Sequence, residues 1–266
     1  MMPLNEMIVK NISSGMTRRE AENYVCQEIV LSKISKSKYL EKVLIKGGVV
    51  MFNYTHNIRR TTNDLDFDFV RYDISNESLY SFINDLNLFD QSFLISIVLI
   101  EELHQDDYHG KRLWVTISDQ KTKLKFKMDI GVHTLMMVEQ DILAFVFLHD
   151  NESLTVKANP PEQIFAEKAY SLAKHGLLTE RFKDVFDIYY LINNKNLNHK
   201  LIKDCLDLLT INGIYNLNSS IDVINKISDI FENQYFKDRL RLSKHKWLDD
   251  EDEVVLKSII DYLYSL

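Results

Sequence analysis

The stretch Asp64-Leu-Asp-Phe-Asp-Phe69 alternates acidic and apolar residues without a break. A repeat of two residues is typical of a β-strand with one buried face, because successive side chains point to opposite sides of a sheet. The three carboxylates therefore share the open face of a predicted strand, and the three apolar side chains share its buried face. The first two carboxylates are two positions apart, so their backbones are separated by about 6.8 Å.

A second strand of the same kind is predicted from Lys121 to Met128, where four lysines alternate with apolar residues. Asp129 continues the lysine face. Since the other face is apolar, we expect this lysine face to be open to solvent or to a ligand.

A short strand, Val43-Leu-Ile-Lys46, ends abruptly at Gly47-Gly48, and a helix is expected from Val49 onward. Two glycines at a strand-to-helix turn offer backbone N–H groups and a helix N-terminus to a phosphate, with no Cβ to prevent close approach. A tight turn selected only for its backbone angles remains the alternative interpretation.

The other elements before residue 150 give an α/β order. Thr17 and Glu20 have the spacing of a capping box, which predicts a helix to about Ile34. A short helix around Leu40, a helix from Glu77 to Leu86 and a buried strand from Phe93 to Ile100 are also expected.

The pattern becomes wholly helical after Asn159-Pro160-Pro161. Pro161 suits a first helical turn, His175-Gly176 suits a helix end, and Thr179 can cap the following helix. We therefore predict two domains, a core over residues 1–155 and a helical domain over residues 156–266. The fold class is α/β in the wider, α+β sense, a mixed sheet flanked by helices with a C-terminal helical region.

Composition limits the classes of function. The chain has 266 residues and a formal net charge of −7, so any contact with nucleic acid has to be local. Cys26 and Cys205 are far apart and lack metal-ligand spacing, which favours a reducing compartment. The longest apolar run, 93–100, is too short to span a bilayer, and no signal peptide is evident. We expect a cytoplasmic protein with no membrane partner.

Asp64, Asp66 and Asp129 are the candidate metal ligands. The first two share a strand face, and a carboxylate from a neighbouring strand would complete a site of the kind that binds a pair of metals. Ligands that are all oxygen atoms indicate Mg²⁺ or Mn²⁺. A solvated strand face would also explain the first two aspartates alone.

Charged residues also interrupt the apolar faces of the helical region. Lys168 lies on an otherwise apolar helix face and needs an anionic partner, which could be Glu167, another carboxylate or a triphosphate. A polar face with a flanking lysine is predicted on the next helix, and a surface ladder of ion pairs is its simplest interpretation. Its residues are Arg181, Lys183, Asp184 and Asp187.

Four motifs follow one another along the chain: Leu44-Ile-Lys-Gly-Gly48, Arg60-Thr-Thr-Asn-Asp-Leu-Asp66, Ala166-Glu-Lys168 and Arg181-Phe-Lys-Asp184-Val-Phe-Asp187. In this order they resemble the AbiEii/AbiGii toxin nucleotidyltransferase family, over about Thr17 to Leu191. The resemblance implies a polymerase-β-like nucleotidyltransferase core with an appended helical region that contributes to the nucleotide site. It also implies relatives of the MenT type, which transfer nucleotides to the acceptor end of tRNA.

Roles follow for the matching residues. The predicted catalytic residues are Asp64, Asp66, Asp129, Lys168 and Asp184. The residues predicted to hold the nucleotide are Lys46, Gly47, Gly48, Arg60, Thr62, Lys168, Arg181, Lys183 and Asp187. The predicted reaction is metal-dependent transfer of NMP from an NTP to an acceptor hydroxyl at the 3′ end of an RNA such as tRNA. The resemblance implies a toxin of the toxin–antitoxin or abortive-infection type, with a cognate antitoxin as a partner.

Alternatives remain open at this point. The acceptor could be a protein or a small molecule, or the fold could serve as a non-catalytic, partner-binding module. For an RNA acceptor, the best basic patch is 237–247, with Trp247 available to stack on a base, although a solvated helix end is the favoured interpretation. The lysine face at 121–127 is the second candidate.

Overall fold

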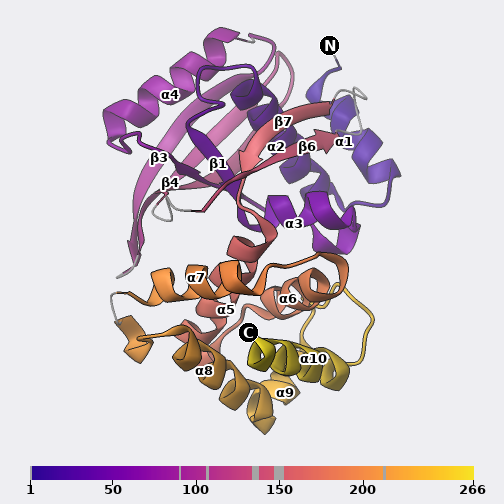
Figure 1. The fold of residues 1–266 in the computed structure, drawn as a ribbon. Helices are drawn as coiled ribbons and strands as arrows, with labels where there is room; N and C mark the ends of the chain where they lie inside the picture. The colour runs from indigo at the N-terminus through magenta and orange to yellow at the C-terminus, as the bar shows by residue number, and fades with distance from the viewer. Residues whose placement is uncertain (1, 90, 106–107, 134–137, 147–152, 212–213) are drawn as a thin grey trace. The chain divides into compact units, whose positions relative to one another are not determined.

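The computed structural model describes residues 2–89, 91–105, 108–133, 138–146, 153–211 and 214–266. The chain divides into two compact units (Figure 1). A sheet unit comprises residues 1–136 with 140–159, and a helical unit comprises residues 137–139 with 160–266. The functional division predicted near residue 155 stays a prediction.

The sheet unit is built on seven strands in the order β3-β4-β5-β2-β1-β7-β6. Two neighbouring pairs, β2 with β5 and β1 with β7, are parallel, and the other pairs are antiparallel. The predicted mixed sheet is therefore confirmed. The strands are β1 (Val43–Lys46), β2 (Leu65–Phe69), β3 (Leu94–Gln105), β4 (Tyr108–Ser118), β5 (Lys123–Val132), β6 (Asp141–Val146) and β7 (Ser153–Ala158).

Helices of the sheet unit follow local signals in the sequence. The capping box is present, because the Thr17 hydroxyl accepts from the N–H of Glu20 and the Glu20 carboxylate accepts from the N–H of Thr17. Aromatic rings of Phe67, Phe69 and Phe82 pack between β2 and the helix α4. The helices are α1 (Leu4–Ser13), α2 (Arg18–Ser35), α3 (Gly47–Thr55), the short 3₁₀ helix η1 (Ile58–Arg60) and α4 (Asn76–Phe89).

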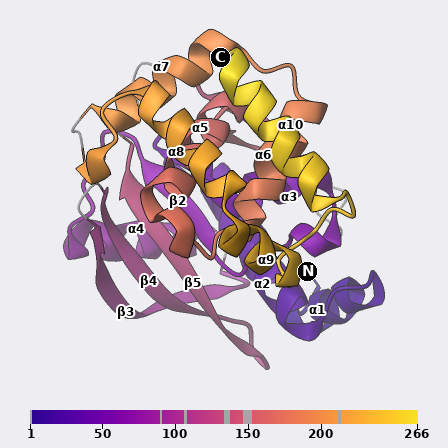
Figure 2. The ribbon, with the colours of Figure 1, turned by 90° about the horizontal axis from the view of Figure 1, so that it is seen from below.

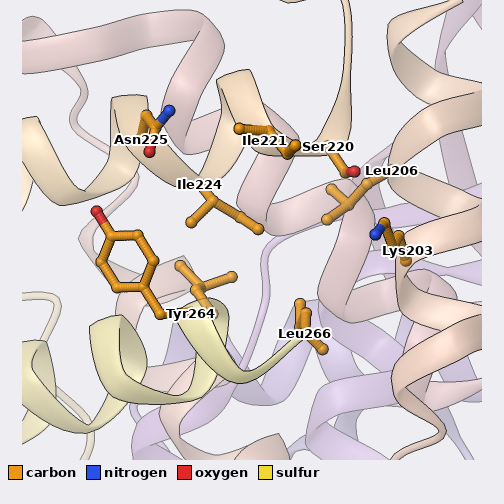
Figure 3. Close-up of a pocket in the computed structure, with 9 residues that line it drawn as sticks. Lys203, Leu206, Ser220, Ile221, Ile224, Asn225, Tyr264 and Leu266 are labelled. Carbon is orange, nitrogen blue, oxygen red and sulfur yellow. The ribbon is translucent and has the colours of Figure 1, made fainter.

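In the helical unit, α5 begins at Pro161, as predicted, and ends before Gly176. A cavity of about 180 Å³ opens among α7, α8 and α10, and its lining is mainly apolar (Figure 3). The elements are α5 (Pro161–His175), η2 (Gly176–Leu178), α6 (Phe182–Asn194), α7 (His199–Thr210), η3 (Ile214–Asn216), α8 (Ser220–Glu232), α9 (Gln234–Leu242) and α10 (Asp252–Ser265).

Two expectations about the sheet unit are wrong. Residues 36–42 form turns and not a short helix. The strand predicted at 93–100 exists, but it lies at an edge of the sheet, and Val98 is 65% exposed. Its apolar run reflects an unusually apolar edge strand and not a central one. None of the helices in the described ranges combines the length and apolar character that crossing a bilayer requires.

Candidate active site

Three carboxylates meet where β2 and β5 run side by side. The two strands are parallel, and their register places Asp66 directly beside Asp129. Asp64 immediately precedes β2 and faces the same way. One oxygen from each of the three aspartates lies within 4.8 Å of the others, and all three side chains are half-buried. Alternation along β2 thus puts Asp64 and Asp66 on one face, and pairing with β5 adds the carboxylate of Asp129.

The turn at Gly47-Gly48 passes very close to this group. A Cβ on Gly47 would lie 2.5 Å from Oδ2 of Asp66, and a Cβ on Gly48 would lie 2.7 Å from Oγ1 of Thr62. Gly47 also has a φ of +69°, which side chains disfavour. Thr62 in turn donates a hydrogen bond of 2.8 Å to Oδ1 of Asp64. Both glycines are therefore needed for the backbone to approach the carboxylates.

Two cations neutralise part of the acidic group. Nζ of Lys127 lies 2.8 Å from Oδ2 of Asp64. Arg112 on β4 binds Asp129 with two hydrogen bonds of 2.8 Å, from Nε and Nη2. Sequence inspection missed Arg112 because its signal is the strand register, in which it lies opposite Asp129.

The pKa values of the aspartates respond to this environment. Burial raises the pKa of Asp66, neighbouring Asp64 and Asp129 raise it further, and the result is about 7. Burial also acts to raise the pKa of Asp64, but hydrogen bonds from Lys127 and Thr62 more than compensate, and the net direction is downward. When all three carboxylates are ionised, they outnumber their two paired cations, Lys127 and Arg112. Three oxygen ligands with excess negative charge fit a divalent cation.

Other predicted nucleotide-binding residues lie on β1 and η1, before and after the turn in the sequence. Lys46, at the end of β1, forms an ion pair of 2.6 Å with Asp68. Arg60 lies buried at the end of η1, two residues before Thr62. Of the predicted residues between 46 and 66, Lys46 therefore directly precedes the turn, and Thr62 and Asp66 lie against its two glycines.

The helical unit holds a second charged cluster, within itself. Nζ of Lys168 on α5 lies 2.6 Å from Asp184 and 2.7 Å from Asp187, both on α6. Arg181 adds an ion pair of 2.6 Å to Asp184, and its own side chain is 52% exposed. Burial acts to raise the pKa of Asp184, but Lys168 and Arg181 hold it well below its usual range. Lys183 is half-buried on the same helix.

This cluster corrects two interpretations of the sequence. The polar face of α6 is not a surface ladder, because Asp184 and Asp187 are buried and pair with the buried Lys168. Trp247 is not available to stack on a base, because it is only 1% exposed and its indole N–H donates to Asp187 at 3.0 Å. A tryptophan beside several lysines looked like a surface residue, but its N–H completes a buried polar network.

The sequence and the fold were each compared with those of known proteins, and the sequence matches a known family. A family model described as a nucleotidyl transferase AbiEii toxin of a type IV toxin–antitoxin system matches residues 29–243. The crystal structure of JHP933 from Helicobacter pylori matches with a TM-score of 0.50 at 12% identity, covering 94% of each chain. That of an antigenic nucleotidyltransferase-like protein from Paracoccidioides brasiliensis has a TM-score of 0.43 at 17% identity, covering 80% of this chain and 97% of that one. No curated protein sequence matches the chain.

The likeness to JHP933 concerns the fold alone, since so few residues are identical. The family model covers most of the chain and includes all four motifs as well as Asp129. The resemblance drawn from those motifs is therefore confirmed, and the chain belongs to the AbiEii family of nucleotidyl transferase toxins of type IV toxin–antitoxin systems.

Proposed function

We propose that this nucleotidyltransferase moves NMP from an NTP to the 3′ hydroxyl of an RNA, with tRNA as the leading acceptor. We propose further that it does so in the cytoplasm as a toxin that a cognate antitoxin controls. The observation that carries the proposal is the meeting of Asp64, Asp66 and Asp129 beside a turn that only glycines can form. Carboxylates next to backbone N–H groups suited to phosphate support the proposal, because the first can bind a cation and the second an anion.

Mg²⁺ or Mn²⁺ is the cofactor that this ligand set fits, with Asp64, Asp66 and Asp129 as ligands. When bound, the cation would lower the pKa of the acceptor hydroxyl and balance negative charge on the triphosphate. In the balanced reaction, the acceptor oxygen forms a bond to the α-phosphorus and the bond from that phosphorus to the bridging oxygen breaks. Pyrophosphate leaves, and the hydroxyl proton passes to solvent.

The chain's own residues have positioning and electrostatic roles in this scheme. Backbone N–H groups of Gly47 and Gly48 would donate to phosphate oxygens. Lys46, which precedes the turn, Thr62, which lies against Gly48, and Arg60 would assist. Catalysis of this kind depends mainly on orientation and on prearranged charge.

For the helical unit, we propose that the cluster of Lys168 and Asp184 takes part in catalysis. Arg181, Lys183 and Asp187 would serve the nucleotide together with Lys168. Support comes from the family motif and from the burial of three charged side chains, which is costly unless they are paired. The half-exposed Arg181 is the member best able to reach a phosphate.

The test is incubation of the purified protein with Mg²⁺, total tRNA and each labelled NTP in turn, with Asp66→Asn as the matched control. Label on tRNA with the wild type only would support the proposal and identify the base. Pyrophosphate release without labelled tRNA would direct attention to a protein or small-molecule acceptor. If neither product forms with any NTP, the chain is a non-catalytic module and the proposal fails.

A further inference from the structure

From the carboxylates the sheet continues outward from β5 to β4 and then to the edge strand β3 (Figure 2). Lys127, which binds Asp64, pairs across the sheet with Trp114, and Trp114 pairs with Leu99 on the edge strand. Neighbouring strands are about 4.8 Å apart. The indole ring therefore lies one strand away from a side chain that touches the candidate metal ligands.

Trp114 is held in an exposed position. Its side chain is 38% exposed, and its indole N–H donates to Oε2 of Glu101 at 2.6 Å. The neighbouring Leu99 is 49% exposed. A large aromatic ring whose orientation is fixed by its polar end, and whose face lies beside exposed apolar surface, is suited to stacking against a flat ligand.

Two lysines lie on the same face, farther along β5. Lys125 pairs across the sheet with Thr116, and Lys123 pairs with Ser118, so neither has an acidic residue opposite. Both lysines are exposed, and among the described residues no carboxylate lies within ion-pair distance of either. Like charges two positions apart repel one another, and here no acidic side chain offsets the repulsion.

The cations therefore change their role along this face. Close to the carboxylates, Arg112 and Lys127 are paired with Asp129 and Asp64. Farther out, the two lysines remain available to an external anion. Positions two apart on a strand are separated by about 6.8 Å, a spacing comparable with that of phosphates along an extended single strand. An aromatic ring beside a row of such cations is the combination that binds single-stranded nucleic acid.

We infer that the face formed by Trp114, Lys123 and Lys125 binds the single-stranded 3′ end of the RNA acceptor. Trp114 stacks on a base, and the two lysines contact phosphates, which directs the terminal hydroxyl toward Asp64, Asp66 and Asp129. The inference rests on the proposed RNA acceptor. A protein partner such as an antitoxin could also use the exposed apolar residues, but it would not require cations at regular spacing next to the candidate reaction site.

The experiment measures binding of a short, fluorescein-labelled single-stranded RNA to the full-length protein, without NTP. Trp114→Ala is expected to weaken binding about tenfold or more, and Trp114→Phe to retain most of it. The double variant Lys123→Gln/Lys125→Gln should reduce the slope of log affinity against log salt by about 1.4. Tyr80→Ala and Lys226→Gln change an exposed aromatic and an exposed lysine on helices, and both should bind as the wild type does.

Tryptophan fluorescence gives an independent measurement, because the chain has only Trp114 and Trp247, and Trp247 is buried. RNA should quench the emission of the wild type and leave that of Trp114→Phe unchanged. Thermal melts of all variants establish that they are folded.

The outcomes separate this inference from the proposed function. Absence of RNA binding by the wild type, or wild-type affinity in both the Trp114→Ala and the double-lysine variants, overturns the inference. In the second case, label transfer to RNA would leave the proposed function intact, and the face would become a candidate site for a protein partner. If the variants bind RNA more weakly but neither they nor the wild type transfer label to RNA, the RNA-binding role of this face is supported. The proposed nucleotidyl transfer to RNA is then overturned.

Discussion

Asp66 is a candidate metal ligand whose negative charge is unfavourable in the folded protein when no metal is bound. Its pKa is raised to about 7, chiefly by burial and then by two neighbouring carboxylates. At this one carboxyl group, the folded protein therefore binds more protons than the unfolded chain between about pH 4 and 7. The stability contribution of this group is fully present below its unfolded pKa, and it is lost as the pH rises through 7.

Asp66→Asn should consequently stabilise the metal-free protein at pH 8, by about 1–3 kcal/mol, because the side chain is half-buried and water weakens the full effect. The gain should shrink as the pH falls toward 4. Urea unfolding in the presence of EDTA at several pH values measures it. A variant that is less stable than the wild type at pH 8 would contradict the account.

Lys168 offers the opposite case, in which charge removal is destabilising. Lys168→Met should cost about 3–5 kcal/mol at pH 7, because it leaves the buried Asp184 and Asp187 without their shared cation. Asp184 has a lowered pKa, so the stability it contributes is present above its unfolded pKa and lost as the pH falls through the folded value. The cost of the substitution should therefore decrease in acid.

Chemical denaturation of Lys168→Met, with the exposed Lys226→Met as the control, checks this expectation. The control should change the free energy of unfolding by less than about 0.5 kcal/mol. Equal, pH-independent losses in both variants would show that the buried ion cluster contributes little.

At the scale of the element, the turn between β1 and α3 determines how close backbone and carboxylate can be. Gly47 and Gly176 both have positive φ, but a Cβ at Gly176 meets nothing within 4 Å, whereas one at Gly47 meets Asp66. Alanine at either position should therefore lower the melting temperature through backbone strain. Only Gly47→Ala should also abolish metal-dependent NTP turnover, since it displaces Asp66. Turnover that survives in Gly47→Ala at temperatures where it is folded would refute this role for the turn.

The elements that the sequence predicted correctly are those with a local signal. Strand β2 and helix α2 could be placed from alternation and from a capping box, which depend on neighbouring residues. Arg112 could not, because its role depends on β4 lying between β3 and β5, and no local pattern specifies that pairing. Trp247 was assigned to the surface for a related reason, since its partner Asp187 lies 60 residues away.

At the scale of the whole molecule, all three candidate metal ligands belong to the sheet unit, so we expect metal binding to stabilise that unit more than the helical unit. Mg²⁺ should stabilise the sheet unit by about 1.4 kcal/mol at ten times its dissociation constant, because it binds the folded carboxylates. Hydrogen exchange should show slower exchange in β2 and β5 on addition of Mg²⁺, and little change in α7 and α8. Asp66→Asn should remove the response. Equal protection of both units by Mg²⁺ alone would contradict a site confined to the sheet unit.

The hydrogen bond from Trp247 to Asp187 has a consequence for anyone who shortens this chain. The family motifs end at residue 187, and the matched region ends at residue 243, so a fragment cut there would keep every recognisable signature. It would nevertheless lose the indole that fills space beside α6 and donates to a buried carboxylate, a loss comparable with the roughly 3–5 kcal/mol of removing a buried tryptophan side chain. The smallest stable toxin is therefore longer than its signature.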